Sequence, residues 1–355
     1  MTKASNRRQE LPVPDFYRAE HASDWHFGPD HATLLEAAIG WRRRHGLSPG
    51  LEDHPRVDLL LIDAQKDFCF PEGTLFVAGR SGSGAIHDND RTARFIYRNL
   101  GAISRITSTL DTHAPHQIFS PSFWLQEDGT VPAPNREVEA ADIREGRLRP
   151  NPALAGWLAD GDYDWLLRQA EYYCEELERK GKYKLYLWPP HCLLGSAGYD
   201  LAGVIQEARM FHAYVRETPA PIVAKGDTPL TEYYSVLGPE VTTTFDGKTL
   251  AQRNEAFLAD LLAADVVIVA GQAASHCVKS TIEDLLTVIP GELARKVYLL
   301  RDCMSAVAVP DLARPGAFLF DFTDQAEAAL GKFREAGMHV VESSTPLSEW
   351  PDFPL

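Results

Sequence analysis

The stretch VIVAGQAASHCVKST, residues 267–281, decides the fold that we expect. It begins with a short apolar run rich in β-branched side chains, which is typical of a strand covered on both faces. Gly271 then permits a sharp turn, and helical spacing starts near Cys277. Cys277 is therefore expected at the carboxyl end of a strand and the start of a helix, where open α/β sheets bind their ligands. Because such a helix start favours a thiolate, we expect a lowered pKa for Cys277; a buried structural cysteine is the alternative.

Strand-like and helix-like segments alternate along the rest of the chain. The expected strands are 57–63, 104–110, 184–188, 221–225, 265–270, 296–302 and 338–343. The expected helices are 33–44, 90–100, 163–180, 200–216, 249–264, 324–336 and a segment that begins at Cys277. This alternation predicts the α/β class, with three layers (α/β/α) around a mostly parallel sheet.

Two segments do not fit the alternation. We expect residues 1–55 to form an N-terminal extension and residues 56–355 to form one α/β domain. Within that domain, residues at about 120–183 separate two strands by far more than an ordinary connection, so they are predicted to be a long insertion.

Composition limits the class of protein. The 355 residues are 45% hydrophobic and 24% charged, as in ordinary globular proteins, and the formal net charge of -15 argues against nucleic-acid or anionic-membrane partners. No apolar run approaches the ~20 residues of a membrane-spanning helix, and no secretion signal is visible at the start. The five cysteines show no zinc-ribbon or CxxC spacing. We therefore expect a cytoplasmic protein. A small-molecule substrate and a homo-oligomer are further expectations, which composition does not establish.

Three chemically active side chains stand at expected strand ends. Asp63 ends the first strand, Lys225 ends the strand at 221–225, and Cys277 follows the strand at 265–270. In a parallel sheet these ends meet at one crevice. There Asp63 could take the thiol proton, Lys225 could favour the thiolate, and the turn before Cys277 could offer N–H groups to an oxyanion. An aspartate that caps a turn and a solvated lysine are the ordinary alternatives.

A second group of polar side chains begins in LDTHAPH, residues 110–116. Asp111 and His113 are two residues apart, which places both on one side of an extended segment. His191, in WPPHC, follows another expected strand, and His116 is a further candidate ligand. A carboxylate and two imidazoles with open positions for water make a catalytic type of metal site. Histidines that are hydrogen-bonded within their own loops are the alternative.

The remaining cysteines and His276 give weaker signals. His276 adjoins Cys277, but neighbouring residues at a helix start point in different directions, so we do not expect it to be the base. Cys192 lies beside His191 with no local sign of activation. The other cysteines are expected to be structural: Cys69, Cys174 and Cys303.

Six motifs in this order resemble the isochorismatase-like cysteine hydrolases, and within them the nicotinamidase/pyrazinamidase branch. They are DAQKDFC (63–69), EGTLFV (72–77), DTHAPH (111–116), WPPHC (188–192), KGDTPLTEYYS (225–235) and GQAASHCV (271–278). The resemblance covers about residues 56–344 and is interrupted at 120–183. Lys66 departs from it, because nicotinamidases commonly have asparagine at that position, and this departure bears on the choice of substrate.

The resemblance implies an isochorismatase-like, Rossmann-like fold with a catalytic triad of Asp63, Lys225 and Cys277. It also implies a cis peptide bond between Gln272 and Ala273, after which the N–H groups of Ala273 and Cys277 form the oxyanion hole.

The resemblance further implies that Asp111, His113 and His191 hold a divalent metal ion, and that Phe68 and Trp188 sandwich the substrate ring. Mixed aspartate and histidine ligands suit zinc, manganese or iron. The ion would orient a ring nitrogen of the substrate or supply water.

We therefore expect a metal-assisted amidohydrolase, with nicotinamide converted to nicotinate and ammonia through a thioester on Cys277 as the leading reaction. Three alternatives stay open. The first is a related enzyme that acts on a ureido or carbamoyl compound. The second is an isochorismatase-type enzyme, which would need neither Cys277 nor a metal. The third is a catalytically idle relative that serves as a binding or scaffold protein.

Overall fold

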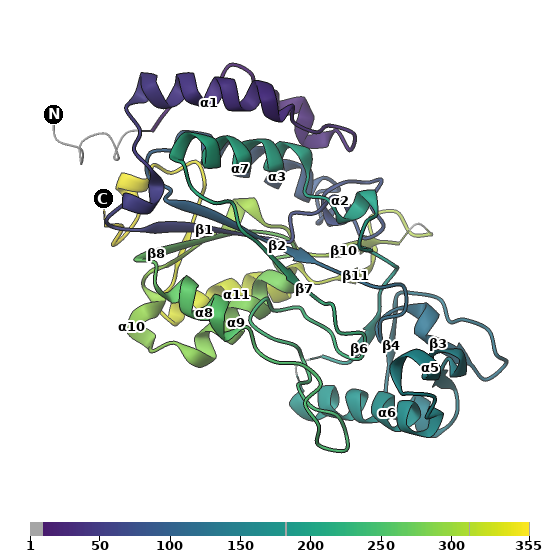
Figure 1. Ribbon diagram of the computed structural model, residues 1–355. Helices are drawn as coiled ribbons and strands as arrows, with labels where there is room; N and C mark the ends of the chain where they lie inside the picture. Colours follow the sequence, from purple (N-terminus) through teal and green to yellow (C-terminus); the bar gives the residue numbers. More distant parts are fainter. Residues whose placement is uncertain (1–9, 182, 312, 355) are drawn as a thin grey trace.

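A six-stranded parallel sheet runs through the centre of the computed structural model, which describes residues 10–181, 183–311 and 313–354 (Figure 1). The strand order is β12-β9-β8-β1-β2-β7, and each neighbouring pair is parallel. The strands are β1 (Val57–Ile62), β2 (Arg105–Asp111), β7 (Ile222–Lys225), β8 (Val266–Gly271), β9 (Val297–Leu300) and β12 (His339–Val341). The expected α/β class with a mostly parallel sheet is confirmed.

The inner strands β1 and β8 are buried along their whole length because each face of the sheet has its own apolar core. In β1, Leu59 and Leu61 belong to one core, whereas Leu60 and Ile62 belong to the other. Side chains alternate between the two faces of a strand, so a strand that is covered on both faces needs a continuous apolar run.

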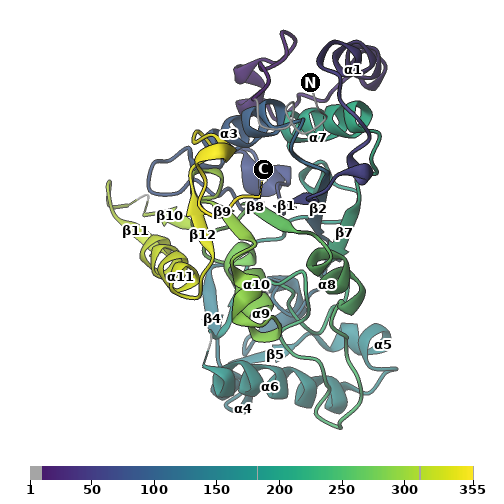
Figure 2. The same cartoon turned by 90° about the vertical axis from the view of Figure 1, so that its left-hand side faces the viewer.

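Helices cover both faces of the sheet (Figures 1 and 2). One face carries α3 (Gly84–Arg98) and α7 (Gly203–Arg216). The opposite face carries α8 (Glu255–Leu262), α9 (Cys277–Val288), α10 (Gly291–Ala294) and α11 (Thr323–Glu335). Helix α1 (His31–His45) lies outside α7 and contributes Leu34, Ala38 and Trp41 to the core of that face. Part of the segment before residue 56 therefore packs against α7, on the outside of the helix layer.

The described residues of segment 120–183 fold into a small lobe with an apolar core of its own, at the lower right of Figure 1. Its elements are β3 (Trp124–Gln126), β4 (Arg136–Val138), α4 (Ala140–Arg144), β5 (Leu148–Pro150), α5 (Ala155–Leu158) and α6 (Tyr163–Lys180). Helix α6 is capped at its start by the Asp162 side chain, which accepts the Trp165 N–H, and ends at Gly181 in the left-handed conformation. The core of the lobe also includes Phe119 and Trp188, which flank the segment.

Several elements differ from those expected. Segment 184–188 contains a strand, β6 (Leu185–Leu187), but it pairs antiparallel with β4, so its expected place in the parallel alternation is wrong. An apolar run indicates burial but does not identify the partner strand. Helix α8 begins only at Glu255, because the Asn254 side chain accepts the Phe257 N–H and caps the helix there. The short helix α2 (Lys66–Cys69) and a hairpin of β10 (Ala308–Pro310) and β11 (Phe318–Asp321) are additional.

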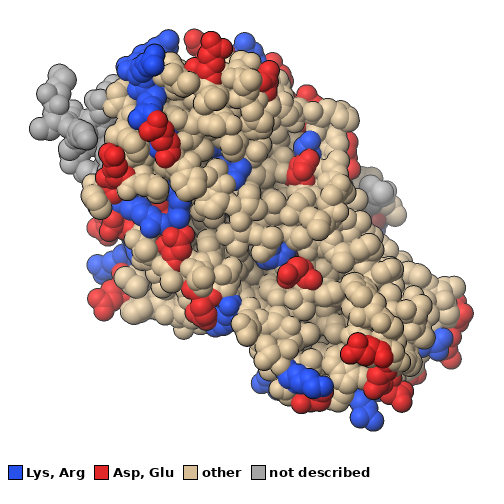
Figure 3. All heavy atoms as spheres, in the orientation of Figure 1, with Lys and Arg blue, Asp and Glu red and all other residues tan. Residues whose placement is uncertain are grey.

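Short 3₁₀ helices complete the described chain. They are η1 (Ala19–Ser23), η2 (Gly50–Glu52), η3 (Pro121–Phe123), η4 (Pro152–Leu154), η5 (Ala197–Tyr199), η6 (Arg301–Cys303) and η7 (Leu347–Glu349). Among the residues that the structure describes, no helix combines the length and apolar character needed to cross a bilayer. On the face seen in Figure 3, acidic and basic side chains are interspersed around a largely uncharged middle.

Candidate active site

The three side chains expected to act together meet at the carboxyl edge of the sheet. Asp63 directly follows β1, Lys225 is the last residue of β7, and Cys277 is the first residue of α9, just beyond β8. These strands lie close together because β8 and β2 both pair with β1 and β7 pairs with β2. The parallel topology therefore brings the three strand ends to one place.

Lys225 connects the carboxylate to the thiol. Its ammonium nitrogen Nζ lies 2.9 Å from Asp63 Oδ2 and 3.7 Å from Cys277 Sγ. Thr109 fixes the other carboxylate oxygen, since its hydroxyl donates to Asp63 Oδ1 over 2.5 Å and accepts the Asp63 N–H over 3.0 Å. A carboxylate, an ammonium and a thiol thus form one buried cluster with Asp63 held in a single orientation.

Burial sets the protonation of this cluster. It raises the pKa of the Cys277 thiol well above its usual value, although the Lys225 ammonium opposes the shift. The lowered pKa expected from the helix start is therefore wrong, because desolvation of the sulfur outweighs the charges that favour the thiolate. Burial also raises the pKa of Asp63, again against Lys225. A protonated thiol beside a carboxylate with a raised pKa is the pairing that general-base catalysis needs.

The turn between β8 and α9 offers unpaired N–H groups. The Gln272–Ala273 peptide bond is cis, as the resemblance implies. Among the described residues, neither the Ala273 N–H nor the Cys277 N–H has a hydrogen-bond acceptor. Gly271 begins the turn at φ +116, and a Cβ there would collide with the carbonyl oxygen of Ile62. The residues named for an oxyanion hole are thus at the pocket with free donors.

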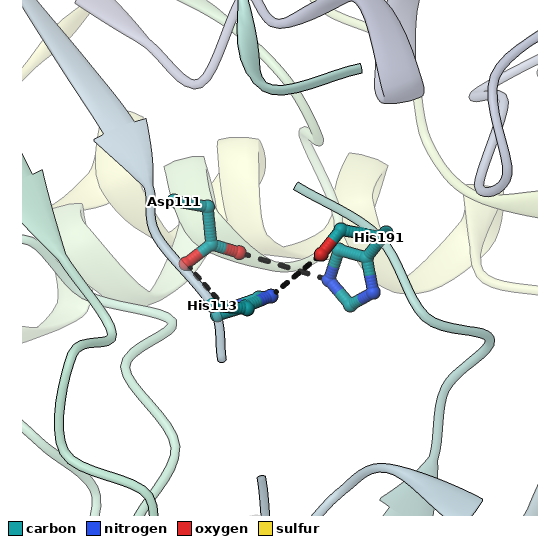
Figure 4. A group of neighbouring side chains, drawn as sticks. All are labelled: Asp111, His113 and His191. Carbon is teal, nitrogen blue, oxygen red and sulfur yellow. Dashed lines mark hydrogen bonds and ion pairs between the residues drawn. The ribbon is translucent and has the colours of Figure 1, made fainter. Parts of the chain in front are cut away.

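Asp111, His113 and His191 point toward one another (Figure 4). One ligand atom from each lies within 4.8 Å of the other two. Asp111 Oδ1 is 3.0 Å from His113 Nε2, and Asp111 Oδ2 is 3.8 Å from His191 Nε2. Lys225 Nζ also donates to Asp111 Oδ1 over 3.0 Å, so the group adjoins the thiol cluster.

The chemistry of this donor set fits a divalent ion. His113 Nδ1 is 3.0 Å from the His191 carbonyl oxygen, and His191 Nδ1 is 2.7 Å from that of Pro189. A carbonyl can only accept, so we assign each proton to Nδ1, which leaves both Nε2 lone pairs facing Asp111. Burial lowers the pKa of His113, which keeps its imidazole neutral, as a metal ligand must be. Burial opposes the charge on Asp111, but the Lys225 ammonium, 3.0 Å away, holds the pKa of that carboxyl well below its usual range.

His116 lies apart from this group. Its ring is near Trp157, at 6.5 Å between centroids, and it does not share the ligand cluster of the described residues.

Gln65 supports the group of Asp111, His113 and His191, although sequence reasoning did not single it out. Its side chain accepts the Asp111 N–H over 2.7 Å and donates to the Asp111 carbonyl over 2.9 Å. The sequence signal that could have identified Gln65 is its position in the motif DAQKDFC, residues 63–69.

Aromatic side chains form the walls of a pocket above both groups. Phe68 and Trp188 line it, as expected, together with Phe119, Tyr234 and His276. Phe68 and Trp188 are almost fully buried, at 7% and 6% exposure, so the pocket has flat apolar walls beside its polar floor. Pockets of this kind, mostly apolar with few convergent polar groups, are typical of small-molecule sites.

His276 and the other cysteines hold positions without a role in proton transfer. His276 Nδ1 is paired with the Ser275 hydroxyl at 2.8 Å, and burial lowers the pKa of His276 to about 3. All five cysteines are free and buried. Burial raises the pKa of Cys192, whose N–H donates to Asp67 Oδ2 over 2.7 Å. This pattern agrees with inert packing of the thiols other than Cys277.

Sequence reasoning also missed Glu232, a buried carboxyl that lines the pocket. Both of its oxygens accept hydrogen bonds of 2.9 Å, one from the Tyr173 hydroxyl and one from the Tyr234 hydroxyl. Burial nevertheless raises the pKa of Glu232 to about 8. Its position two residues before the YS of KGDTPLTEYYS gave no chemical hint.

Solved structures of nicotinamidases and pyrazinamidases are similar to this chain at low identity. The yeast nicotinamidase bound to the inhibitor nicotinaldehyde is 17% identical, with a TM-score of 0.48, over 81% of this chain and 99% of that one. The Acinetobacter baumanii nicotinamidase/pyrazinamidase is 17% identical, with a TM-score of 0.47, over 82% and 97%. The Pyrococcus horikoshii pyrazinamidase in complex with zinc is 19% identical, with a TM-score of 0.40, over 81% and 99%.

No protein-family model matches the sequence, and no curated protein matches it significantly.

Proposed function

We propose that the protein is a cysteine amidohydrolase that hydrolyses a small aromatic amide, with nicotinamide as the leading substrate. The observation that carries this proposal is the buried cluster in which Lys225 Nζ lies 2.9 Å from Asp63 and 3.7 Å from Cys277. Isolated buried charges are unfavourable, so a buried carboxylate and ammonium beside a thiol that lines a pocket suit a reaction better than a structural role.

The first half of the proposed reaction forms a thioester. Asp63 takes the proton of the Cys277 thiol as sulfur attacks the amide carbonyl carbon, and the adjacent Lys225 ammonium stabilises the negative charge. The N–H groups of Ala273 and Cys277 donate to the oxyanion. Asp63 then returns its proton to the amide nitrogen, the C–N bond breaks, and ammonia leaves.

The second half releases the acid product. Asp63, now a carboxylate, takes a proton from a water molecule that attacks the thioester carbonyl. The C–S bond breaks, sulfur leaves as the thiolate beside Lys225, and the proton held by Asp63 returns to it. The cluster is then back in its starting protonation state, so the cycle balances without a further reactant.

A divalent ion held by Asp111, His113 and His191 would supply a Lewis acid that fixes a basic atom of the substrate or a water molecule. Asp111, His113, His191 and Cys277 line one pocket. A substrate held at the three ligands would therefore present its amide carbonyl to Cys277 from a fixed direction. The flat walls that Phe68 and Trp188 provide suit an aromatic ring, whose faces stack on such side chains.

Ammonia release from nicotinamide by purified, metal-loaded protein tests the proposal. Cys277→Ala should reduce the rate on the order of 10⁴-fold or more, because it removes the nucleophile. Chelator treatment should also abolish turnover, and added zinc or manganese should restore it. Cys303→Ala is the matched control, since Cys303 is equally buried but lies in the core under α3 and away from the pocket.

Two results would contradict nicotinamide as the substrate. Metal-loaded wild-type protein that releases ammonia only from ureido or carbamoyl compounds would place the chain among other amidohydrolases. Protein that hydrolyses no amide, and whose function in its host survives Cys277→Ala, would be an idle relative with a binding role.

A further inference from the structure

A chain of hydrogen bonds runs from the wall of the pocket to the lobe formed by residues 120–183. Trp188 Nε1 donates to the Tyr234 hydroxyl over 2.8 Å, and that hydroxyl donates to Glu232 Oε1 over 2.9 Å. The Tyr173 hydroxyl, on helix α6 of the lobe, donates to Glu232 Oε2 over 2.9 Å. Glu232 therefore joins the pocket residue Trp188 to α6.

The direction of each hydrogen bond in this chain is fixed. The indole of Trp188 can only donate, so the Tyr234 oxygen accepts, and the Tyr234 proton must go to Glu232. The Glu232 N–H donates to the Tyr173 oxygen over 3.0 Å, so the Tyr173 proton must also go to the Glu232 carboxyl. Two phenol protons thus converge on one carboxyl group. Each of these hydrogen bonds replaces one that the carboxyl would make to water if it were exposed.

The end of the chain at Tyr173 and Glu232 is enclosed in the protein. Tyr173 is 0% and Glu232 is 3% exposed, so neither can exchange its partner for solvent. The Trp188 ring also packs edge-on against His276, at 5.3 Å between ring centroids. A change at α6 can therefore reach the pocket through Tyr173, Glu232 and Tyr234, even though no atom of α6 lines the pocket among the described residues.

We propose that Glu232 is a positioning residue that fixes the ring of Trp188 in the pocket by tying Tyr234 to Tyr173 of α6. The lobe of residues 120–183 is then part of the substrate site: it sets the orientation of the wall on which an aromatic substrate stacks. The predicted effect on turnover rests on the proposed amide hydrolysis, whereas the effect on Trp188 itself does not.

The indole N–H signal of Trp188 in nitrogen-edited NMR reports on the chain directly. The protein has seven tryptophans, and a Trp188→Phe variant identifies the signal. Above pH 8, where Glu232 is a carboxylate, Glu232→Gln retains the size of the side chain but turns one acceptor into a donor, so one of the two phenols loses its partner. Tyr173→Phe removes the link to α6. Both variants should shift the Trp188 signal and speed its exchange with solvent.

Tyr172→Phe is the matched control. Tyr172 is the neighbouring residue on α6, and its hydroxyl pairs with Thr243 Oγ1 at 3.1 Å on the exposed side of the helix. This variant loses a hydroxyl from the same helix and should leave the Trp188 signal unchanged. A thermal melt of each variant verifies that it is folded.

Kinetics supply the second readout. Glu232→Gln and Tyr173→Phe should raise KM for nicotinamide about tenfold while kcat changes by less than about threefold, because stacking is weakened and the thiol cluster is untouched. A Trp188 signal that stays in place in both folded variants overturns the proposal, whatever the enzyme activity. If wild-type protein hydrolyses no amide but the Trp188 signal moves, the positioning chain stands and the proposed function falls.

Discussion

A carboxylate can act as base for a thiol only if it is itself ready to accept a proton, and Asp63 meets this condition through burial. Asp63→Asn preserves the shape of the side chain but removes the basic oxygen, so the rate of amide hydrolysis should fall by ~10²–10⁴-fold. The measurement is kcat/KM for nicotinamide from pH 6 to pH 9. The lost activity should not return at any pH in this range.

The control for this prediction is a second buried aspartate. Asp53 pairs with Arg216 at 2.6 Å, near the amino end of the sheet. Asp53→Asn should lower the free energy of unfolding by ~3–5 kcal/mol, since it strands a buried guanidinium, yet leave kcat/KM unchanged in the folded protein. Equal losses of activity in both variants would show that Asp63 acts through stability and not as the base.

Gly226 allows the proposed metal ligands Asp111 and His113 to approach the backbone. It adopts φ +90, and a Cβ would lie 3.0 Å from Asp111 Oδ1 and 3.1 Å from His113 Nε2. Gly226→Ala should therefore weaken zinc binding by about 10–100-fold, measured by calorimetry, because the methyl group displaces two ligands. Gly129→Ala is matched, with φ +83 and open space around the position. It carries the same backbone strain and should bind zinc normally.

Residues at strand ends were accessible to sequence reasoning, whereas the side chains that support them were not. Asp63, Lys225 and Cys277 each follow an apolar run, so the parallel topology alone predicts that they meet. Tyr173 and Glu232 are 59 residues apart, in segments with no periodicity in common. Local patterns carry no information about such a hydrogen bond. The catalytic roles stay predictions until the substitutions above are measured.

At the scale of elements, capping decides where a helix starts. The apolar spacing at 249–264 predicts a longer helix than α8, but the Asn254 side chain accepts the Phe257 N–H at 3.2 Å and ends the irregular segment before it. Asn254→Ala should lower the free energy of unfolding by about 1 kcal/mol, measured in urea. An unchanged midpoint and slope would mean that packing against the sheet, and not the cap, fixes this boundary.

The strands that were predicted correctly differ from the others in length and burial. β1 and β8 are covered on both faces, so their apolar runs are long and unambiguous. β6 has three residues and pairs with β4 inside the lobe, and the hairpin of β10 and β11 is equally short. Runs of this length are compatible with many partners, so the partner is determined by tertiary packing.

At the scale of the whole molecule, the pocket beside Cys277 lies where the lobe meets the carboxyl edge of the sheet. Trp188 and Phe119 belong to the core of the lobe, whereas Cys277 belongs to a core of the sheet, and all three line the pocket. The site is thus assembled from two separately packed units. Glu232 is buried at this junction, so its protonation should affect the stability of the entire fold.

The stability of the protein should therefore depend on pH through Glu232. Its pKa is about 8 in the folded chain against an ordinary value of 4.5, so between these values the folded state retains a proton that the unfolded state has lost. Stability contributed by this proton must then fall as pH rises from about 5 to 8, by ~5 kcal/mol at most.

Glu232→Gln cannot ionise, so the free energy of unfolding of this variant should decrease less than that of the wild type over the same pH interval. Urea unfolding at several pH values measures this difference. The matched substitution is Glu335→Gln, at an exposed position of α11. Parallel curves for wild type and Glu232→Gln would show that the carboxyl is ionised throughout, held by the two tyrosine hydroxyls.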